Sequence, residues 1–127
     1  VMASSSKTMT VPQIALRLAE LCNQGEFEKA QKELFAENAV SIEPEASVGF
    51  EKETKGLDAI LEKGKKFASM VEEVHSCGVS DHLVAGNMIA LSLKMDVTMK
   101  GQARSIMNEL CVYKVKDEKI ISEQFFM

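Results

Sequence analysis

A regular alternation of apolar and polar residues constrains this chain more than any other feature. From Ile89 to Met99 the sequence reads IALSLKMDVTM, and the residues at odd positions are apolar throughout. A period of two is typical of a β-strand with one buried face and one face that is solvated or paired. The sequence therefore predicts a sheet, and the flanking segments decide what covers it.

The segments before this strand have mostly helical periodicity, and those after it are extended. Apolar residues spaced three and four apart predict helices over residues 12–23, 27–35 and 57–71. Shorter extended runs predict strands over residues 39–45, 71–79, 83–85, 105–115 and 120–126. Two glycines and four charges between residues 48 and 56 predict a loop. Helix, helix, strand, helix and a meander of about four strands form one α+β unit.

The ends of the first helix are marked by particular residues. Thr10 is a suitable N-cap, and Pro12 falls in the first turn, where a missing N–H is tolerated. Gly25 ends the helix and allows a short turn into the second one. The two segments are therefore predicted to form a helical hairpin.

Composition places the chain among ordinary globular domains. Its 127 residues are enough for one domain, which we assign to residues 11–127, with residues 1–10 as a disordered or expression-derived tail. The net charge of −4 gives no electrostatic reason to expect nucleic acid. Three widely spaced cysteines indicate neither a disulfide framework nor a zinc site. With no signal peptide or membrane span in the sequence, we expect a cytoplasmic protein.

Several short segments, in this order, carry a resemblance to a known superfamily. They are LFAENA at residues 34–39, GLDAI at 56–60, VYKV at 112–115 and KII at 119–121. From residue 11 to residue 126 the chain resembles the nuclear transport factor 2-like superfamily, and within it the SnoaL-like, or polyketide cyclase-like, group. The resemblance implies a cone-shaped, curved mixed sheet wrapped by three helices. It also implies a ligand pocket inside the cone and a homodimer through the outer face of the sheet. Because members range from cyclases and isomerases to binding modules, the fold alone does not choose a function.

The resemblance to the ketosteroid isomerase branch holds at one position and fails at two. That branch has a carboxylate base directly before a proline, and Glu43 precedes Pro44 here. Its two oxyanion donors, a tyrosine and a protonated acid, correspond to Leu18 and to Cys111 or a neighbour. Without two strong donors, an enolate lacks the stabilisation that dominates such chemistry. Isomerisation by the same machinery is therefore not expected.

Two residues are candidates for catalysis. A carboxylate at Glu43, where a strand opens into an apolar cone, would have its pKa raised by desolvation and would suit a general base. The alternative is a solvated glutamate at the rim. His75 lies within a predicted strand and could relay a proton with Glu43 or Glu109, although a structural or interface histidine is the alternative.

The remaining pocket candidates follow from strand alternation. If Cys111 faces the cone, Glu109 faces it too, provided that no β-bulge intervenes, and it then needs a partner. Tyr113, the sole tyrosine, offers a hydroxyl donor, and methionines offer an adaptable apolar lining, although plain core packing explains both equally well. The residues expected to contact a ligand are Leu18, Met95, Val97, Met107, Glu109, Cys111 and Tyr113.

The polar face of the long strand is a candidate interface. Lys94, Asp96 and Thr98 lie opposite the apolar stripe, and this face corresponds to the dimer contact that the resemblance implies. The sequence has no spacing typical of metal ligands, no phosphate-binding loop and no nucleophile elbow, so neither a metal nor a cofactor is expected.

These observations predict a small-molecule-binding SnoaL-like domain, and two hypotheses remain open. In the first, Glu43 acts as base in a cofactor-independent cyclase-type or isomerase-type proton transfer on an apolar or carbonyl-bearing ligand, assisted by His75 or Tyr113. In the second, the cone is filled and the domain is a non-catalytic homodimeric interaction module. An open cavity with a polar group inside it distinguishes the first from the second.

Overall fold

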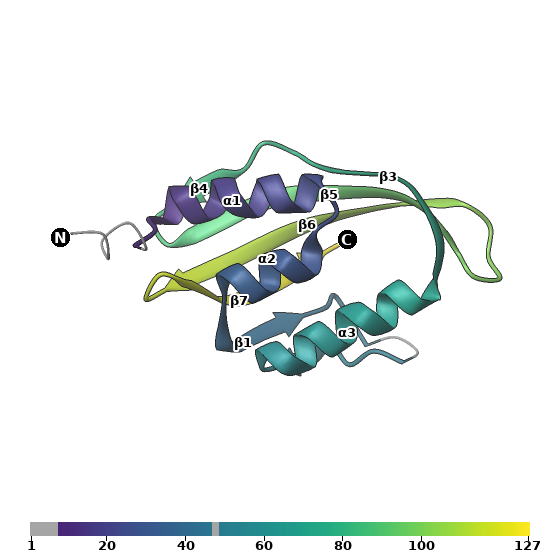
Figure 1. Cartoon of the computed structure of the whole chain (residues 1–127), viewed down its shortest axis with the longest axis horizontal. Coiled ribbons are helices and arrows are strands. Elements are labelled where there is room, and N and C mark those ends of the chain that lie inside the picture. The colour runs from purple at the N-terminus through teal and green to yellow at the C-terminus, as the bar shows by residue number, and fades with distance from the viewer. Residues whose placement is uncertain (1–7, 47–48) are drawn as a thin grey trace.

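The structure is a computed structural model that describes residues 8–46 and 49–127 (Figure 1). Three helices precede or interrupt the strands: α1 (Val11–Asn23), α2 (Phe27–Leu34) and α3 (Leu57–Met70). The strands are β1 (Phe35–Ile42), β2 (Glu53–Lys55), β3 (Val71–Val79), β4 (Leu83–Ala85), β5 (Met88–Met99), β6 (Ser105–Lys116) and β7 (Lys119–Phe126). The predicted α+β class and order of elements are confirmed.

The seven strands form one open, mixed sheet. The strand order is β2-β1-β7-β6-β5-β3, and β4 pairs with β5 beside β3. Strands β1 and β7 are parallel, and the other pairs are antiparallel. The first and last strands of the domain therefore lie side by side, and the long β5–β6 hairpin extends beyond the helices (Figure 1).

The helical hairpin forms as its end signals predict. The Thr10 hydroxyl accepts a hydrogen bond from the N–H of Gln13, whose side chain accepts one from the N–H of Thr10, so both groups satisfy free helix donors. Gly25 adopts a φ of 74°, which allows the tight turn into α2. The guanidinium of Arg17 donates two hydrogen bonds to Glu33, at 2.6 and 2.9 Å, and so joins the two helices.

The alternation in β5 sets which face of the sheet is buried. Ile89, Leu91, Met95 and Val97 are buried, and together with the inner sides of α1 and α3 they exclude water from the core. The register pairs Leu91 with Cys111, so β6 presents the same face. None of the three helices of residues 8–46 and 49–127 covers the opposite face (Figure 1).

Two bulges, one in β3 and one in β7, change the alternation beside candidate site residues, and β3 has a further register shift at Glu72, between the pairs Val71–Met99 and Glu73–Thr98. In β3, Val74 pairs with Val97 and Ser76 with Asp96, which leaves His75 as an extra residue. In β7, Ile120 pairs with Val115 and Ser122 with Lys114, which leaves Ile121 as an extra residue. A bulge changes which side chains point to a given face on either side of it.

Several boundaries differ from the predictions, most of them by one residue and those of β1 by more. Strand β1 begins at Phe35 rather than residue 39, because the chain turns extended directly after α2. The predicted loop contains β2, whose three residues pair with the end of β1. Of the predicted tail, residues 1–7 lie outside the described residues, whereas Thr10 caps α1. Within the described ranges, no helix has the length and apolar character needed to cross a membrane.

Candidate functional site

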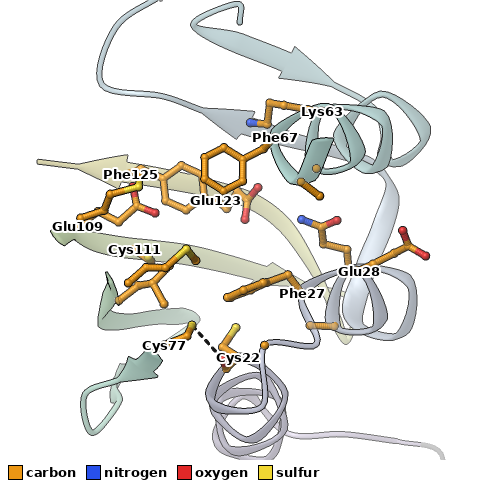
Figure 2. A pocket seen from close by; sticks show the side chains of 18 of the residues that line it. Cys22, Phe27, Glu28, Lys63, Phe67, Cys77, Glu109, Cys111, Glu123 and Phe125 are labelled. Atoms are coloured by element: carbon orange, nitrogen blue, oxygen red, sulfur yellow. Dashed lines mark hydrogen bonds between the residues drawn. The ribbon is translucent and has the colours of Figure 1, made fainter. Parts of the chain in front are cut away.

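A cavity of about 1330 Å³ lies between the helices and the buried face of the sheet. The side chains around it come from all three helices and from strands β1, β3, β5, β6 and β7. In Figure 2, Phe27 and Phe67 point into this space from the helices, and Glu123 and Phe125 face them from the sheet. The described residues therefore leave an open cavity, rather than a filled core, between the helices and the sheet.

The lining contains most of the predicted contact residues. They are Leu18, Met95, Met107, Glu109, Cys111 and Tyr113, and Glu43, the predicted base, lines the cavity as well. Val97 does not line the cavity: it is fully buried where β5 pairs with β3, and it packs as core. Glu109 lies on the same face of β6 as Cys111, as strand alternation predicts, because the β5–β6 register is continuous there.

The structure does not bring His75 to the cavity. The bulge in β3 turns Val74 and Cys77 inward, and the His75 ring reaches the other face of the sheet. Its Nε2 lies 2.7 Å from the Thr98 hydroxyl, and its Nδ1 lies 3.4 Å from the Glu73 carboxylate. In this geometry the ring contacts Thr98 and Glu73 rather than Glu43 or Glu109.

Glu43 lies at the cavity wall and forms an ion pair. Its carboxylate accepts a hydrogen bond of 2.8 Å from the Lys63 ammonium of α3. The side chains are 27% and 15% exposed respectively, so the pair is partly shielded from solvent. Glu43 therefore has a counter-ion, and the groups most affected by burial lie deeper in the site.

Lys63 also begins a chain of hydrogen bonds that reaches the sheet. Its ammonium donates to the Ser41 hydroxyl at 2.7 Å, and that hydroxyl donates to Oε2 of Glu123 at 2.7 Å. The same ammonium lies 5.8 Å from the centre of the Phe125 ring, within cation–π range. Lys63 thus links α3, β1 and β7 at the inner end of the cavity.

Burial raises the pKa of two carboxyl groups in this region. Desolvation, together with repulsion from Glu43, raises the pKa of Glu109 to about 7, although Lys63 opposes the change. Desolvation raises the pKa of Glu123 to about 7 as well, against the Ser41 hydrogen bond and Lys63. Both groups therefore exchange protons near neutral pH, which suits general acid–base chemistry.

The two carboxyl groups differ in how they are held. Glu123 is 4% exposed and is positioned by Ser41. For Glu109, no hydrogen-bond or ion-pair partner is found among the described residues, and it faces the open cavity (Figure 2). Glu109 is accordingly the group that is free to meet a ligand.

Three cysteines and one tyrosine complete the apolar part of the wall. Burial raises the pKa of Cys22 to about 12 and the pKa values of Cys111 and Tyr113 still further above their ordinary ones. The Cys77 thiol donates a weak hydrogen bond to the carbonyl of Cys22, at 3.8 Å (Figure 2). These groups stay protonated and act as hydrophobic lining.

Three residues of this site escaped the sequence reasoning: Lys63, Ser41 and Glu123. Lys63 lies one helical turn from the buried Ile60 and close to Phe67, which is a weak signal in an amphipathic helix. Glu123 is hidden by the bulge in β7, because alternation counted from the buried Ile120 points it outward. No group of three metal-ligating side chains converges anywhere in residues 8–46 and 49–127.

The comparisons with known proteins agree on one family. The family model of the SnoaL-like domain matches residues 9–127 of the chain. A solved structure from Mesorhizobium loti, described as a SnoaL-like polyketide cyclase and also as a carbohydrate phosphatase, is 33% identical. The match covers 94% of this chain and all of that one, with a TM-score of 0.85. No curated protein matches the sequence significantly.

More distant structures share the fold. A SnoaL-like polyketide cyclase from Jannaschia is 12% identical, with 91% of this chain and 83% of that one covered and a TM-score of 0.72. A protein with a ketosteroid isomerase-like fold from Catenulispora acidiphila, in complex with trimethylamine, is 18% identical. That match covers 93% and 87% of the two chains, with a TM-score of 0.71.

Proposed function

Because the chain belongs to the SnoaL-like domain family of the nuclear transport factor 2-like superfamily, we propose that it binds a small, largely apolar or carbonyl-bearing molecule and transfers a proton on it. The observation that carries the proposal is an unpaired carboxyl group, Glu109, with a pKa of about 7 in the wall of a large cavity. Such a cavity, apolar with a few convergent polar groups, is the usual setting of a ligand site. It favours a hollow binding domain over a filled scaffold.

The proton transfer assigns different roles to the charged groups. Glu109 takes a proton from the carbon next to the carbonyl group; the C–H electron pair moves into the new C–C double bond, and the carbonyl oxygen gains negative charge. Lys63, which lines the same cavity from α3, supplies positive charge for that oxygen, since electrostatic stabilisation dominates such steps. In a β,γ-unsaturated ketone, return of the proton from Glu109 to the γ-carbon moves the double bond into conjugation and completes an isomerisation. In a dicarbonyl ligand, attack of the enolate carbon forms a C–C bond and breaks the π bond of the second carbonyl, and the resulting alkoxide takes the proton back from Glu109, which completes a cyclisation.

In this scheme Glu43 is a positioning residue rather than the base. Its ion pair with Lys63 fixes the ammonium at the point where Ser41 and Phe125 also hold it. Removing Glu43 therefore changes the placement of the positive charge, whereas removing Glu109 removes the proton acceptor. The two variants separate the two roles.

Deuterium exchange tests the proposal without a known substrate. In D₂O, 4-phenylbutan-2-one and other aromatic ketones are expected to gain deuterium next to the carbonyl group faster with the protein than with buffer alone. Glu109→Gln should abolish this acceleration, and Glu20→Gln, at an exposed position of α1 outside the cavity, should retain it. Equal exchange in the protein and in Glu109→Gln would refute the assignment of the base.

A second function, self-association, is favoured by the outer face of the sheet. No helix covers this face, and Ile106, Leu110 and Phe126 are about half exposed on it. Leu110 pairs directly with Phe126, so their side chains form a continuous apolar surface beside the polar row of β5. We propose that two copies meet here. Sedimentation should give the mass of a dimer for the protein and of a monomer for Leu110→Lys, with Lys29→Glu on α2 as control.

A further inference from the structure

The charges around the cavity are strongly unequal. Seven glutamates and two lysines line it. At its inner end, three carboxyl groups face a single ammonium, that of Lys63, which Glu43 already neutralises at 2.8 Å. Repulsion from Glu43 and Glu109 contributes to the raised pKa of Glu123. The inner end therefore has an excess of negative charge that no other described residue balances.

The apolar part of the wall is aromatic. Five of the six phenylalanines and the sole tyrosine of the chain line the cavity: Phe27, Phe35, Phe50, Phe67, Phe125 and Tyr113. Aromatic faces attract cations, most strongly where water is excluded. The protein's own ammonium groups already use them, since Lys63 lies 5.8 Å from the centre of Phe125 and Lys66 lies 5.1 Å from that of Phe50.

One carboxyl group in this region is almost completely buried and still incompletely bonded. Glu123 is 4% exposed, and Ser41 donates to its Oε2. Among the described residues no donor is found for its second oxygen, Oε1, and because no fully buried side-chain oxygen there lacks a partner, Oε1 is open to the cavity. Figure 2 shows Glu123 among the residues that line the cavity, with Phe67 and Phe125 in the same lining. A buried carboxylate is stable only when paired or hydrogen-bonded, so a donor from a ligand fits this position.

We propose that the ligand carries a protonated amine on an apolar, aromatic-sized body, and that its ammonium group binds Glu123 among the phenylalanine rings. This inference rests on the proposed function, because it assigns the ligand class of the same cavity. An anionic ligand is disfavoured, because it would have to displace Glu43 from Lys63 while facing Glu109 and Glu123. The ammonium also keeps Glu109 ionised near neutral pH, which is the form that accepts a proton.

Binding of an ammonium near Glu109 and Glu123 is linked to proton release. Their pKa values are about 7, so each is partly protonated at neutral pH. A neighbouring cation lowers both pKa values and expels up to about one proton per site. The other titratable or charged groups that face this end are Lys63 of α3, Glu43 directly after β1, Cys111 and Tyr113 of β6, Cys22 of α1 and Cys77 of β3. Burial keeps the thiols and the phenol protonated, so they do not contribute.

Four probes of one size test the inference by titration calorimetry. They are 3-phenylpropylamine, 3-phenylpropan-1-ol, 3-phenylpropanoate and 4-phenylbutan-2-one. At pH 8 we expect the amine to bind about tenfold or more tightly than the alcohol, and the carboxylate to bind most weakly. At pH 5.5 the preference for the amine should largely disappear. At pH 7, buffers of different ionisation enthalpy should reveal proton release on amine binding.

The variants assign the effect to one residue. Glu123→Gln should reduce the preference for the amine over the alcohol to within about threefold and leave alcohol binding unchanged, whereas Glu20→Gln, at an exposed position of α1 outside the cavity, should alter neither. If the carboxylate binds more tightly than the amine, or if all four probes bind equally, the proposed ligand class is overturned. The proton-transfer proposal would still stand in that case, provided that the ketone exchanges deuterium. No binding of any probe and no ketone exchange would overturn both.

Discussion

Replacement of Glu123 by glutamine removes a charge that the fold does not favour. The folded-state pKa of Glu123 is about 7, against an ordinary value of 4.5. A carboxyl group whose pKa is raised by folding contributes its full stability below its unfolded pKa and loses it as the pH rises through the folded value. The protein should therefore lose free energy of unfolding from this group between about pH 4.5 and pH 7.

The expected size follows from the displacement of the pKa. A difference of about 2.5 units corresponds to about 3 kcal/mol at pH values above 7. Glutamine keeps an oxygen that accepts the Ser41 hydrogen bond but carries no charge. At pH 8.5 the Glu123→Gln variant should thus be more stable than the unsubstituted protein by about 3 kcal/mol, which corresponds to about 10 °C in Tm for a chain of this length. Near pH 4.5 the two should differ by less than about 0.5 kcal/mol.

Urea denaturation of both proteins at pH 4.5 and 8.5 measures this difference. Glu37→Gln, at an exposed position of β1, serves as the control and should change stability at neither pH. A stability difference between Glu123→Gln and the protein that is the same at both pH values would show that the carboxyl group does not titrate within this range. Destabilisation by Glu123→Gln at pH 8.5 would show that Glu123 is ionised and well paired, and would refute the reasoning.

Three further predictions concern other parts of the molecule. Glu43→Gln should destabilise the fold by about 1–2 kcal/mol at pH 7 in urea denaturation, because the partly buried Lys63 loses its counter-ion; a gain in stability would contradict the ion pair. In the native protein at pH 8, a thiol reagent should label Cys77 first, and Cys22 and Cys111 much more slowly, because these two thiols are buried. All three should react in urea. Fast labelling of Cys22 in the native protein would contradict its raised pKa. Addition of 3-phenylpropylamine should raise Tm at pH 8 more than at pH 5.5, and an equal rise at both would contradict the ionised carboxylate as its partner.

Much of the architecture was readable because its signals are local. The Thr10 capping box and Gly25 define the helical hairpin through contacts within a few residues. The alternation in β5 fixed its buried face, and through a continuous register it placed Cys111 and Glu109 correctly as well. Strand β2 was missed because three residues are too few for a period to appear.

The candidate site was less predictable because it depends on where alternation fails. A single extra residue in β3 sends His75 to the outer face, and another in β7 brings Glu123 inward. Neither bulge has a glycine or proline that marks it in the sequence. The chain from Lys63 through Ser41 to Glu123 joins residues up to 82 positions apart, so it exists only once the sheet is assembled.

The central claim is that two desolvated carboxyl groups face an open cavity and titrate near neutral pH. A ¹³C NMR titration of the glutamate carboxyl groups, assigned with Glu109→Gln and Glu123→Gln, measures this directly. The structure predicts two resonances that titrate near pH 7, of which one disappears in each variant, and both should move to lower pH when 3-phenylpropylamine is bound. Titration of every glutamate between about pH 3.5 and 5, as in exposed carboxyl groups, would contradict the account.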